Sequence, residues 1–186
     1  MSVRLVSLLK RGGIAIVPTD TLYGIVARAF DRKAVRRLYA IRRKTPKKPF
    51  IVLISSTKEL ATFGIRPNAA SLRFLSRVWP GKVSVILHCP SKKFAYLHLG
   101  TRTLAFRLPK SRRLIELLKK TGPLVAPSAN PEGEKPAQTM SQAKKYFARA
   151  VDAYQGAGKK MTGTASTVIS LLGSVPKVLR QGAIRV

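Results

Sequence analysis

Polar and basic side chains follow the apolar runs of this sequence, at the points where buried strands would end. Thr19, Asp20 and Thr21 come directly after the run 14–17, which is rich in β-branched residues and is closed by Pro18. Similar positions beside other apolar runs are held by Lys44, Lys48, Thr103, Arg107, Ser128, Asn130, Ser166 and Arg180. Because ligands in α/β sheets usually bind beyond the strand ends, we expect these groups to converge on one pocket.

The chemistry of this set favours an anionic ligand. The set combines cations with many neutral hydrogen-bond donors and contains almost no carboxylate. Each charged hydrogen bond to such a ligand would contribute roughly 1.5–3 kcal/mol. Taken singly, the residues also have simpler explanations, such as turn formation by Thr19 and Asn130 or a solvated charge on Lys44 and Lys48. Their joint placement is what predicts a nucleotide site.

The sequence contains few residues that could form other kinds of site. His88 and His98 are ten residues apart and the only cysteine is Cys89, which is not a zinc-ligand set, so no metal-ligating side chains are expected. The sequence has no G-x-S-x-G motif, and Cys89 is expected to be a small core residue. The run 156–160 departs from the P-loop pattern and is expected to be a flexible basic loop.

Charge is the most unusual property of the composition. Lysine and arginine number 36 against 7 aspartates and glutamates, a net charge of +29 in 186 residues. Such a field attracts polyanions, which favours nucleotide or RNA partners, although a generally basic proteome in the source would give the same charge. No apolar run approaches the roughly 18–20 residues that span a bilayer, and a single cysteine fits a reducing compartment. A cytoplasmic protein that does not act at a membrane is expected.

Periodicity and capping residues place the elements that would position these groups. Helices are predicted from Ser2 to Gly12, after Asp31, and over 56–63, 68–78, 111–120 and 141–149. Strands are predicted over 14–17, 50–54, 83–87, 104–107, 123–127, 151–154, 167–171 and 175–179. The proline-containing basic segment 42–49 is predicted to be a loop. Helices and strands mixed without a linker predict one α/β domain over residues 1–186 with a mixed sheet.

Seven short motifs make the sequence recognisable. They are Pro18–Gly24, Lys48–Val52, Trp79–Gly81, Arg107–Pro109, Ala126–Asn130, Ser166–Ile169 and Leu179–Ile184. Each is weak alone, but in this order and over nearly the whole length the chain resembles the threonylcarbamoyl-AMP synthase family, the YrdC-like domain, in its short single-domain form. The resemblance implies a twisted mixed α/β sheet with flanking helices and a large basic concave face.

The resemblance also implies an activity, that of L-threonylcarbamoyladenylate synthase, which is a nucleotidyltransferase. It would form threonylcarbamoyl-AMP and pyrophosphate from L-threonine, bicarbonate and ATP, with Mg²⁺ accompanying the ATP. The product would supply threonylcarbamoyladenosine modification of tRNA through a downstream threonylcarbamoyl transferase complex. The net charge and the expected basic concave face also favour tRNA or other RNA as a partner that binds directly.

Residue roles follow from the same resemblance. Thr21, Arg107 and Ser166 correspond to threonine contacts, and the guanidinium fork of Arg107 suits a carboxylate. The nucleotide contacts correspond to Lys44, Lys48, Thr103, Ser128, Asn130, Thr139 and Arg180. Lys44, Lys48 and Arg107 would act in catalysis as cations that stabilise developing phosphate charge.

Two features depart from the family pattern. The family's K-x-R stands here as Arg42-Arg43-Lys44, with its charges exchanged, and Leu53 stands where many relatives carry a histidine. Lysine and arginine are not equivalent at a phosphate site.

Two other readings stay open. A non-catalytic module that binds double-stranded RNA, tRNA or rRNA on the same fold would explain the net charge of +29. The related domain of hydrogenase-maturation carbamoyltransferases is the other reading, but the further portions expected there do not fit within 186 residues.

Overall fold

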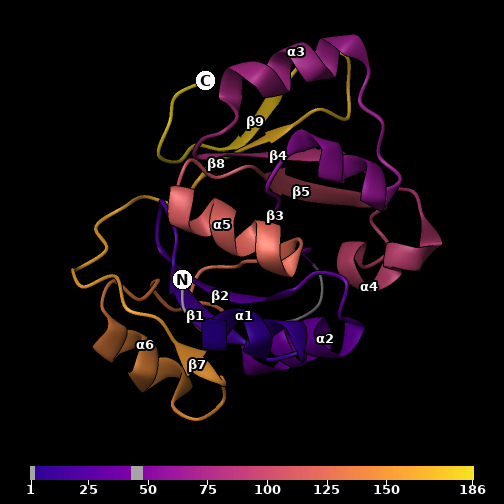
Figure 1. Cartoon of the computed structure of the whole chain (residues 1–186). Helices are drawn as coiled ribbons and strands as arrows, with labels where there is room; N and C mark the ends of the chain where they lie inside the picture. Colours follow the sequence, from indigo (N-terminus) through magenta and orange to yellow (C-terminus); the bar gives the residue numbers. More distant parts are fainter. Residues whose placement is uncertain (1–2, 43–47) are drawn as a thin grey trace.

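The structure of the chain is a computed structural model that describes residues 3–42 and 48–186. Within these ranges nine strands form one sheet in the order β7-β1-β2-β6-β3-β5-β4-β8-β9 (Figure 1). The strands are β1 (Ala15–Pro18), β2 (Tyr23–Arg28), β3 (Val52–Leu53), β4 (Val83–His88), β5 (Thr103–Arg107), β6 (Leu124–Val125), β7 (Ala153–Tyr154), β8 (Thr167–Ser170) and β9 (Lys177–Arg180). The helices are α1 (Val3–Lys10), α2 (Arg32–Ile41), α3 (Ala69–Val78), α4 (Ala95–His98), α5 (Arg112–Thr121) and α6 (Met140–Phe147), with 3₁₀ helices η1 (Thr57–Phe63) and η2 (Lys92–Phe94).

The sheet is mixed, as the sequence predicts. β1 pairs in parallel with β7, β3 with β5, and β4 with β8, whereas the pairs β1–β2, β2–β6, β3–β6, β4–β5 and β8–β9 are antiparallel. Parallel pairs need crossover connections and antiparallel neighbours do not. The order therefore brings segments far apart in the sequence side by side, which is how distant motifs come to share one site.

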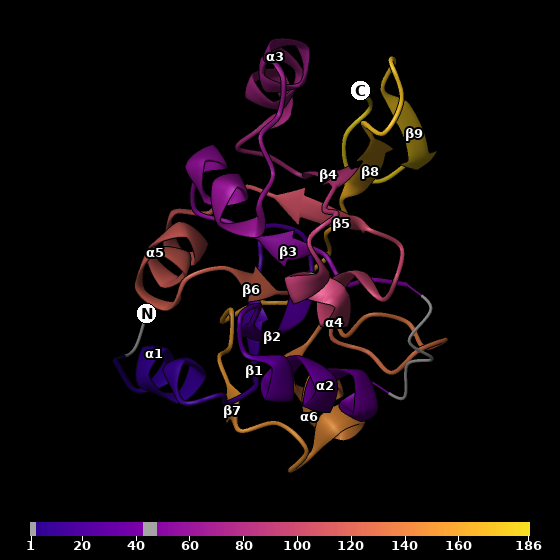
Figure 2. The same cartoon turned by 90° about the vertical axis from the view of Figure 1, so that its right-hand side faces the viewer.

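One face of the sheet is covered by α1 and α5. Leu5 and Leu9 of α1 pack with Leu114, Leu117 and Leu118 of α5 in a cluster that also contains residues of β1, β2, β3 and β6. The i, i+3, i+4 spacing of these leucines gives each helix a single apolar stripe. Figure 2 shows these two helices on one side of β2, β6 and β3, and α4 on the other side.

The opposite face holds the larger core. Phe63 of η1 lies at its centre, with ring centroids 4.9 Å from Phe30, 5.2 Å from Phe94 and 4.9 Å from Phe106. Leu38 of α2 belongs to the same cluster. Aromatic pairs at these separations add about 0.5–1.5 kcal/mol beyond their area burial, so the cluster ties η1, η2 and β5 together.

Most predicted helices begin and end where the sequence indicates. Asp31, Asn68 and Ser111 are the N-caps of α2, α3 and α5, and each side chain accepts a hydrogen bond from the N–H three residues ahead. Gly12, with φ of +84°, and Gly64, with φ of +73°, follow α1 and η1. This left-handed backbone is strained for any residue with a Cβ, which explains why glycine marks both helix ends.

Three local predictions are wrong. No element was expected over 23–28, yet this segment is β2, because pairing with β1 and β6 and burial on both faces outweigh the weak strand propensity of Gly24 and Ala27. The segment after Cys89 was expected to be a loop, but it contains η2 and α4. The spacing of Ser56 and Glu59 predicts a capping box, but Ser56 makes no capping bond; Glu59 instead accepts from the backbone N–H of Ser55 at 2.7 Å.

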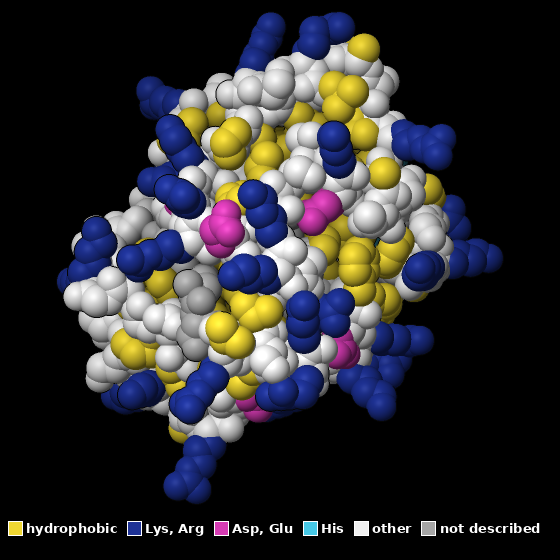
Figure 3. Space-filling view, viewed as in Figure 1, with side chains coloured by type: hydrophobic (Ala, Val, Ile, Leu, Met, Phe, Trp, Pro, Cys, Tyr) yellow, Lys and Arg dark blue, Asp and Glu magenta, His cyan; other side chains and the backbone are white. Residues whose placement is uncertain are grey.

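Basic side chains are the commonest charged groups on one face of the molecule. On the face shown in Figure 3, lysines and arginines are spread from end to end, with few acids between them. In the described part of the chain, no helix has both the length and the apolar character needed to cross a bilayer.

Two leucines of α3 test the assignment of the core. Leu75 is fully buried and Leu72 is 46% exposed on the same helix. We expect Leu75→Ala to lower the free energy of unfolding by about 2–5 kcal/mol, and Leu72→Ala to change it by less than about 1 kcal/mol. Urea denaturation followed by the fluorescence of Trp79 measures both. Equal losses in the two variants would contradict the placement of α3.

Candidate functional site

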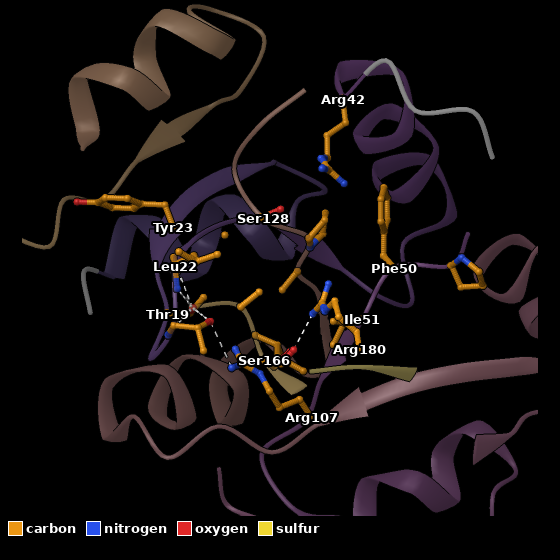
Figure 4. A pocket seen from close by; sticks show the side chains of 17 residues that line it. Thr19, Leu22, Tyr23, Arg42, Phe50, Ile51, Arg107, Ser128, Ser166 and Arg180 are labelled. Carbon is orange, nitrogen blue, oxygen red and sulfur yellow. Dashed lines mark hydrogen bonds between the residues drawn. The ribbon is translucent and has the colours of Figure 1, made fainter. Parts of the chain in front are cut away.

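A cavity of about 240 Å³ lies where seven stretches of the chain meet, most of them at strand ends in the middle of the sheet. The predicted site residues that line it are Thr21, Arg107, Ser128, Ser166 and Arg180. They come from the turn before β2, the end of β5, the segment after β6, the residue before β8 and the end of β9. In Figure 4, Arg107 and Ser166 lie at one end of the cavity and Arg42 with Phe50 at the other. The predicted convergence of these five residues is therefore present.

The turn between β1 and β2 is organised by the hydroxyl of Thr19. Its Oγ1 lies 2.6 Å from the Leu22 carbonyl, and because a carbonyl only accepts, Thr19 donates its proton there. The same oxygen accepts from the backbone N–H groups of Thr21 and Leu22 at 3.1 and 3.2 Å. Such side-chain bonds to nearby backbone are typical of threonine in turns, and they fix where Thr21 points.

The Thr19 hydroxyl also fixes the proton of Thr21. The two hydroxyl oxygens are 3.0 Å apart, and since the Thr19 proton is on the Leu22 carbonyl, Thr21 must be the donor. The Thr21 oxygen then offers only lone pairs to the cavity. Arg107 Nη1, a donor, lies 3.4 Å from it, which agrees with this assignment.

Arg107 is the most buried cation of the site. Its side chain is 5% exposed, and Nη1 lies 3.1 Å from Oδ1 of Asp20, whose side chain is 10% exposed. Burial lowers the pKa of Arg107, and the charge of Asp20 partly offsets this. Arg107 remains charged, because arginine does not lose its proton in proteins. A fixed positive charge therefore lies at the inner end of the cavity.

The C-terminal motif is held against Ser166 by a second hydroxyl. Thr167 Oγ1 donates to the Ile184 carbonyl at 2.5 Å and accepts from the N–H groups of Gly182 and Ile184 at 3.1 and 3.3 Å. A Cβ on Gly182 would overlap the backbone of residues 165–167, so only glycine permits this approach. The approach places the Arg180 guanidinium, which donates to the Ser166 carbonyl at 2.7 Å.

The two polar groups at this end are supported differently. The Ser166 hydroxyl is buried and lies 2.9 Å from the hydroxyl of Ser84 on β4. The Arg180 side chain is exposed as a whole, but its guanidinium lies partly buried against Ser166, and this burial lowers its pKa.

Arg42 is a site residue that was not predicted. It follows α2, is 7% exposed, and lines the cavity with its guanidinium 5.7 Å from the centre of the Phe50 ring. Its Nε donates to the Asn130 carbonyl at 2.8 Å, and burial lowers its pKa. The signal was present in the sequence, because Arg42 stands at the first position of the K-x-R motif, but only Lys44 of that motif was assigned.

Several predicted nucleotide residues do not line the cavity. Thr103 begins β5 whereas Arg107 ends it, so the two lie at opposite ends of the strand, and the Thr103 hydroxyl bonds to Thr101. Thr139 caps α6 in a capping box with Gln142. Lys48 is exposed, and Lys44 lies outside the described residues.

The side chain of Asn130 stabilises the loop that follows it. Its Nδ2 donates to the carbonyls of Pro131 and Glu134, both at 2.8 Å, while its Oδ1 is buried without a hydrogen-bond partner. Asn130 thus supports the cavity wall through the loop and through its own carbonyl, which accepts from Arg42.

Two larger cavities border the same turn, of about 700 and 610 Å³. Both are lined by Asp20 and Ser111. Neither is lined by a residue that was predicted to contact the threonine substrate or the nucleotide. Size alone therefore does not identify the site here. The smaller cavity is the candidate because it gathers the converging polar groups.

The remaining reactive groups lie elsewhere. Cys89 is fully buried, as expected of a core residue, and burial raises its pKa to about 11. His98 is 4% exposed and accepts from the Gly100 N–H through Nδ1 at 3.2 Å. Among the residues that the structure describes, no cluster of three or more His, Cys, Asp or Glu side chains could hold a metal ion.

The cavity lining is suited to an anionic ligand. Three arginines line it, Arg42, Arg107 and Arg180, and none of its described lining residues is an aspartate or glutamate. Burial strengthens their interaction with a bound anion, because the local dielectric is lower than that of water. Fold and site together define an α/β protein with an arginine-lined cavity suited to a small anionic ligand.

Comparisons with known proteins agree with this class. Residues 7–182 match the Sua5/YciO/YrdC family, described as telomere recombination. A Mycobacterium tuberculosis protein provisionally named threonylcarbamoyl-AMP synthase is 34% identical over 96% of this chain and 82% of its own length. The Bacillus subtilis threonylcarbamoyl-AMP synthase is 32% identical over 96% of this chain and 52% of its own length.

A solved structure extends the similarity to three dimensions. The crystal structure of Pyrococcus abyssi Sua5 complexed with L-threonine superposes with a TM-score of 0.89 at 26% identity, covering 96% of this chain and 53% of that one. This chain belongs to the Sua5/YciO/YrdC family. The predicted family and fold class are both confirmed.

Thr19 can be tested as the organiser of the turn. We expect Thr19→Val to lower the free energy of unfolding by about 1–3 kcal/mol, because it leaves the N–H groups of Thr21 and Leu22 without their acceptor. Thr19→Ser keeps the hydroxyl and should stay within about 1 kcal/mol of the wild type. Urea denaturation measures the free energy of unfolding of both variants. Equal stability of Thr19→Val and Thr19→Ser would refute the role of the Thr19 hydroxyl in the turn.

Cys89 offers a test of burial by chemical reactivity. Only the thiolate reacts with a disulfide reagent, and a pKa of about 11 keeps the thiol protonated at pH 8. We expect the folded protein to react at least about 100-fold more slowly at pH 8 than the same protein in urea, since both thiolate fraction and access are reduced. Similar rates in the two states would show that Cys89 is accessible.

Proposed function

We propose that the protein is a threonylcarbamoyl-AMP synthase. The observation that carries this proposal is the cavity itself, in which three arginines and the Thr21 and Ser166 hydroxyls face one another without a competing acid. Relatives of this name are 28–34% identical over most of the chain. The structure of the Pyrococcus abyssi relative, Sua5, was solved in complex with L-threonine.

The proposed reaction is a nucleotidyl transfer. The threonine amine and bicarbonate form a carbamate with loss of water. A carbamate oxygen then attacks the α-phosphorus of ATP, and the bond from that phosphorus to the bridging oxygen breaks, releasing pyrophosphate. No protein nucleophile takes part, so catalysis depends on positioning and on charge stabilisation.

Residue roles follow from the hydrogen-bond inventory. Arg107 would bind the threonine carboxylate, because it is the fixed cation at the inner end of the cavity. Thr21 would accept from the threonine amine rather than donate to the carboxylate, because its own proton is held by Thr19. Arg180 and Arg42, which approach the cavity from β9 and α2, would bind phosphate oxygens.

We propose that Mg²⁺ enters the site bound to ATP and not to protein side chains. The described lining residues supply no carboxylate, and Mg²⁺ at phosphate sites usually keeps waters and substrate oxygens as ligands. The donor set therefore fits an ion that arrives with the triphosphate and neutralises its charge. Lys44 and Lys48 keep their proposed nucleotide and catalytic roles from the family motif.

RNA binding is the competing proposal, and the net charge of +29 favours it. The cavity favours a small ligand instead, because an RNA backbone cannot reach a guanidinium that is 5% exposed inside the sheet. We therefore assign catalysis to the cavity. We further propose that tRNA or other RNA and the downstream transferase complex are partners of the protein, and that it is located in the cytoplasm.

Pyrophosphate release tests the proposal directly. We expect wild-type protein to release pyrophosphate from ATP only with both threonine and bicarbonate, and EDTA to abolish release. Arg107→Ala should lower kcat/KM for threonine by about 100-fold, because losing a buried charged contact costs about 2–3 kcal/mol and each 1.36 kcal/mol is a factor of ten.

Two controls accompany this measurement. Arg73→Ala removes an exposed arginine of α3 and should leave activity within about twofold of wild type. Arg107→Lys keeps the charge without the fork and should retain part of the activity. Release that does not depend on threonine, or that is unchanged in Arg107→Ala, would refute the assignment.

A further inference from the structure

We propose that Asp20 is a positioning residue for the amino-acid substrate: it fixes the guanidinium of Arg107 without itself touching the ligand. This inference rests on the proposed function, because Arg107 is the group assigned to the threonine carboxylate. Asp20 is one residue before Thr21 in the turn between β1 and β2. The same short turn would then set both contacts to the substrate.

The location of Asp20 separates it from the ligand contacts. Its Oδ1 lies 3.1 Å from Arg107 Nη1, but Asp20 does not line the candidate cavity. It lines the two other cavities, and Arg107 and Thr21 line neither of them. A carboxylate in this place compensates the cation without entering the cavity lining, whereas a carboxylate in the lining would repel the carboxylate and phosphates of the substrates.

Asp20 is itself held in place. Its Oδ2 accepts from the backbone N–H of Lys110 at 3.2 Å, three residues after Arg107. The carboxylate therefore bridges the turn that carries Thr21 and the segment that carries Arg107. This bridge links the position of the Thr21 hydroxyl to that of the guanidinium across the sheet.

The geometry of the ion pair leaves Arg107 able to bind an anion. Asp20 Oδ1 has no aligned hydrogen bond although the charged nitrogen is 3.1 Å away. The attraction is then mainly between charges, and it does not occupy the full fork of guanidinium N–H groups. A bound carboxylate can still take the donors on the cavity side.

A purely structural ion pair would behave differently. Breaking a buried pair leaves the remaining charge uncompensated and destabilises the fold, and it would affect both substrates alike. A positioning role predicts a selective loss for the ligand that Arg107 binds. Arg37 and Asp152 provide a control for the loss of an Arg–Asp pair, because this second, more exposed pair, 2.6 Å between charged atoms, does not line the cavity.

The experiment compares wild type, Asp20→Asn, Asp20→Glu and Asp152→Asn. Calorimetric titration with L-threonine gives binding without turnover, and pyrophosphate release gives KM for threonine and for ATP. We expect Asp20→Asn to weaken threonine binding and raise its KM by about 10- to 100-fold, as small misplacements of binding groups do, with KM for ATP within about threefold. Asp20→Glu keeps the charge and should recover part of the loss. Asp152→Asn should leave both KM values within about threefold.

A double-mutant cycle makes the outcome decisive. In an Arg107→Lys background, Asp20→Asn should add less than about threefold to the loss of threonine affinity, because both changes act through one group. Unchanged threonine binding in Asp20→Asn, or an equal rise of both KM values, would overturn the positioning role while leaving the proposed function intact. If Asp20→Asn fails to fold, a threonine KM in Asp20→Glu equal to wild type overturns it. No threonine binding by wild type would overturn both proposals.

Discussion

A buried guanidinium needs a compensating charge and a fixed place, and Arg107 imposes this constraint on the whole site. Its side chain is 5% exposed at the end of β5, in the middle of the sheet. The desolvation of such a charge is costly unless it is paired, so Asp20 must approach from the β1–β2 turn. The pairing then keeps the remaining donors of the cation available on the cavity side.

Two threonine hydroxyls perform the same task for two segments that line the site. Thr19 closes the turn that carries Thr21, and Thr167 fastens the C-terminal segment that carries Arg180. Each hydroxyl both donates to a carbonyl and accepts from backbone N–H groups, so each fixes a loop with one side chain. The proposed ligand contacts are therefore held by hydrogen bonds within the protein itself, and pre-organised groups lose less entropy on binding.

Local sequence signals predicted the helices well and the strands less completely. N-caps and C-terminal glycines act within one turn of chain, so Asp31 and Gly12 mark helix limits without help from the rest of the fold. β2 was missed because its pairing with β1 and β6 and its burial on both faces depend on distant residues. The same division holds for the site. Arg42 lines the cavity but was not assigned. Thr103 was assigned because the sequence cannot tell which end of β5 faces the cavity.

The sequence by itself determined the family, the mixed α/β class, the shortage of acids and the identity of most polar groups at the strand ends, because these depend on residue type and local order. Only the tertiary structure decided which of those groups meet. The sheet order places β2, β5, β8 and β9 around one cavity, and it pairs Asp20 with Arg107 outside the cavity lining. Strand pairing and burial across the whole chain fix these positions, and no short stretch of sequence contains them.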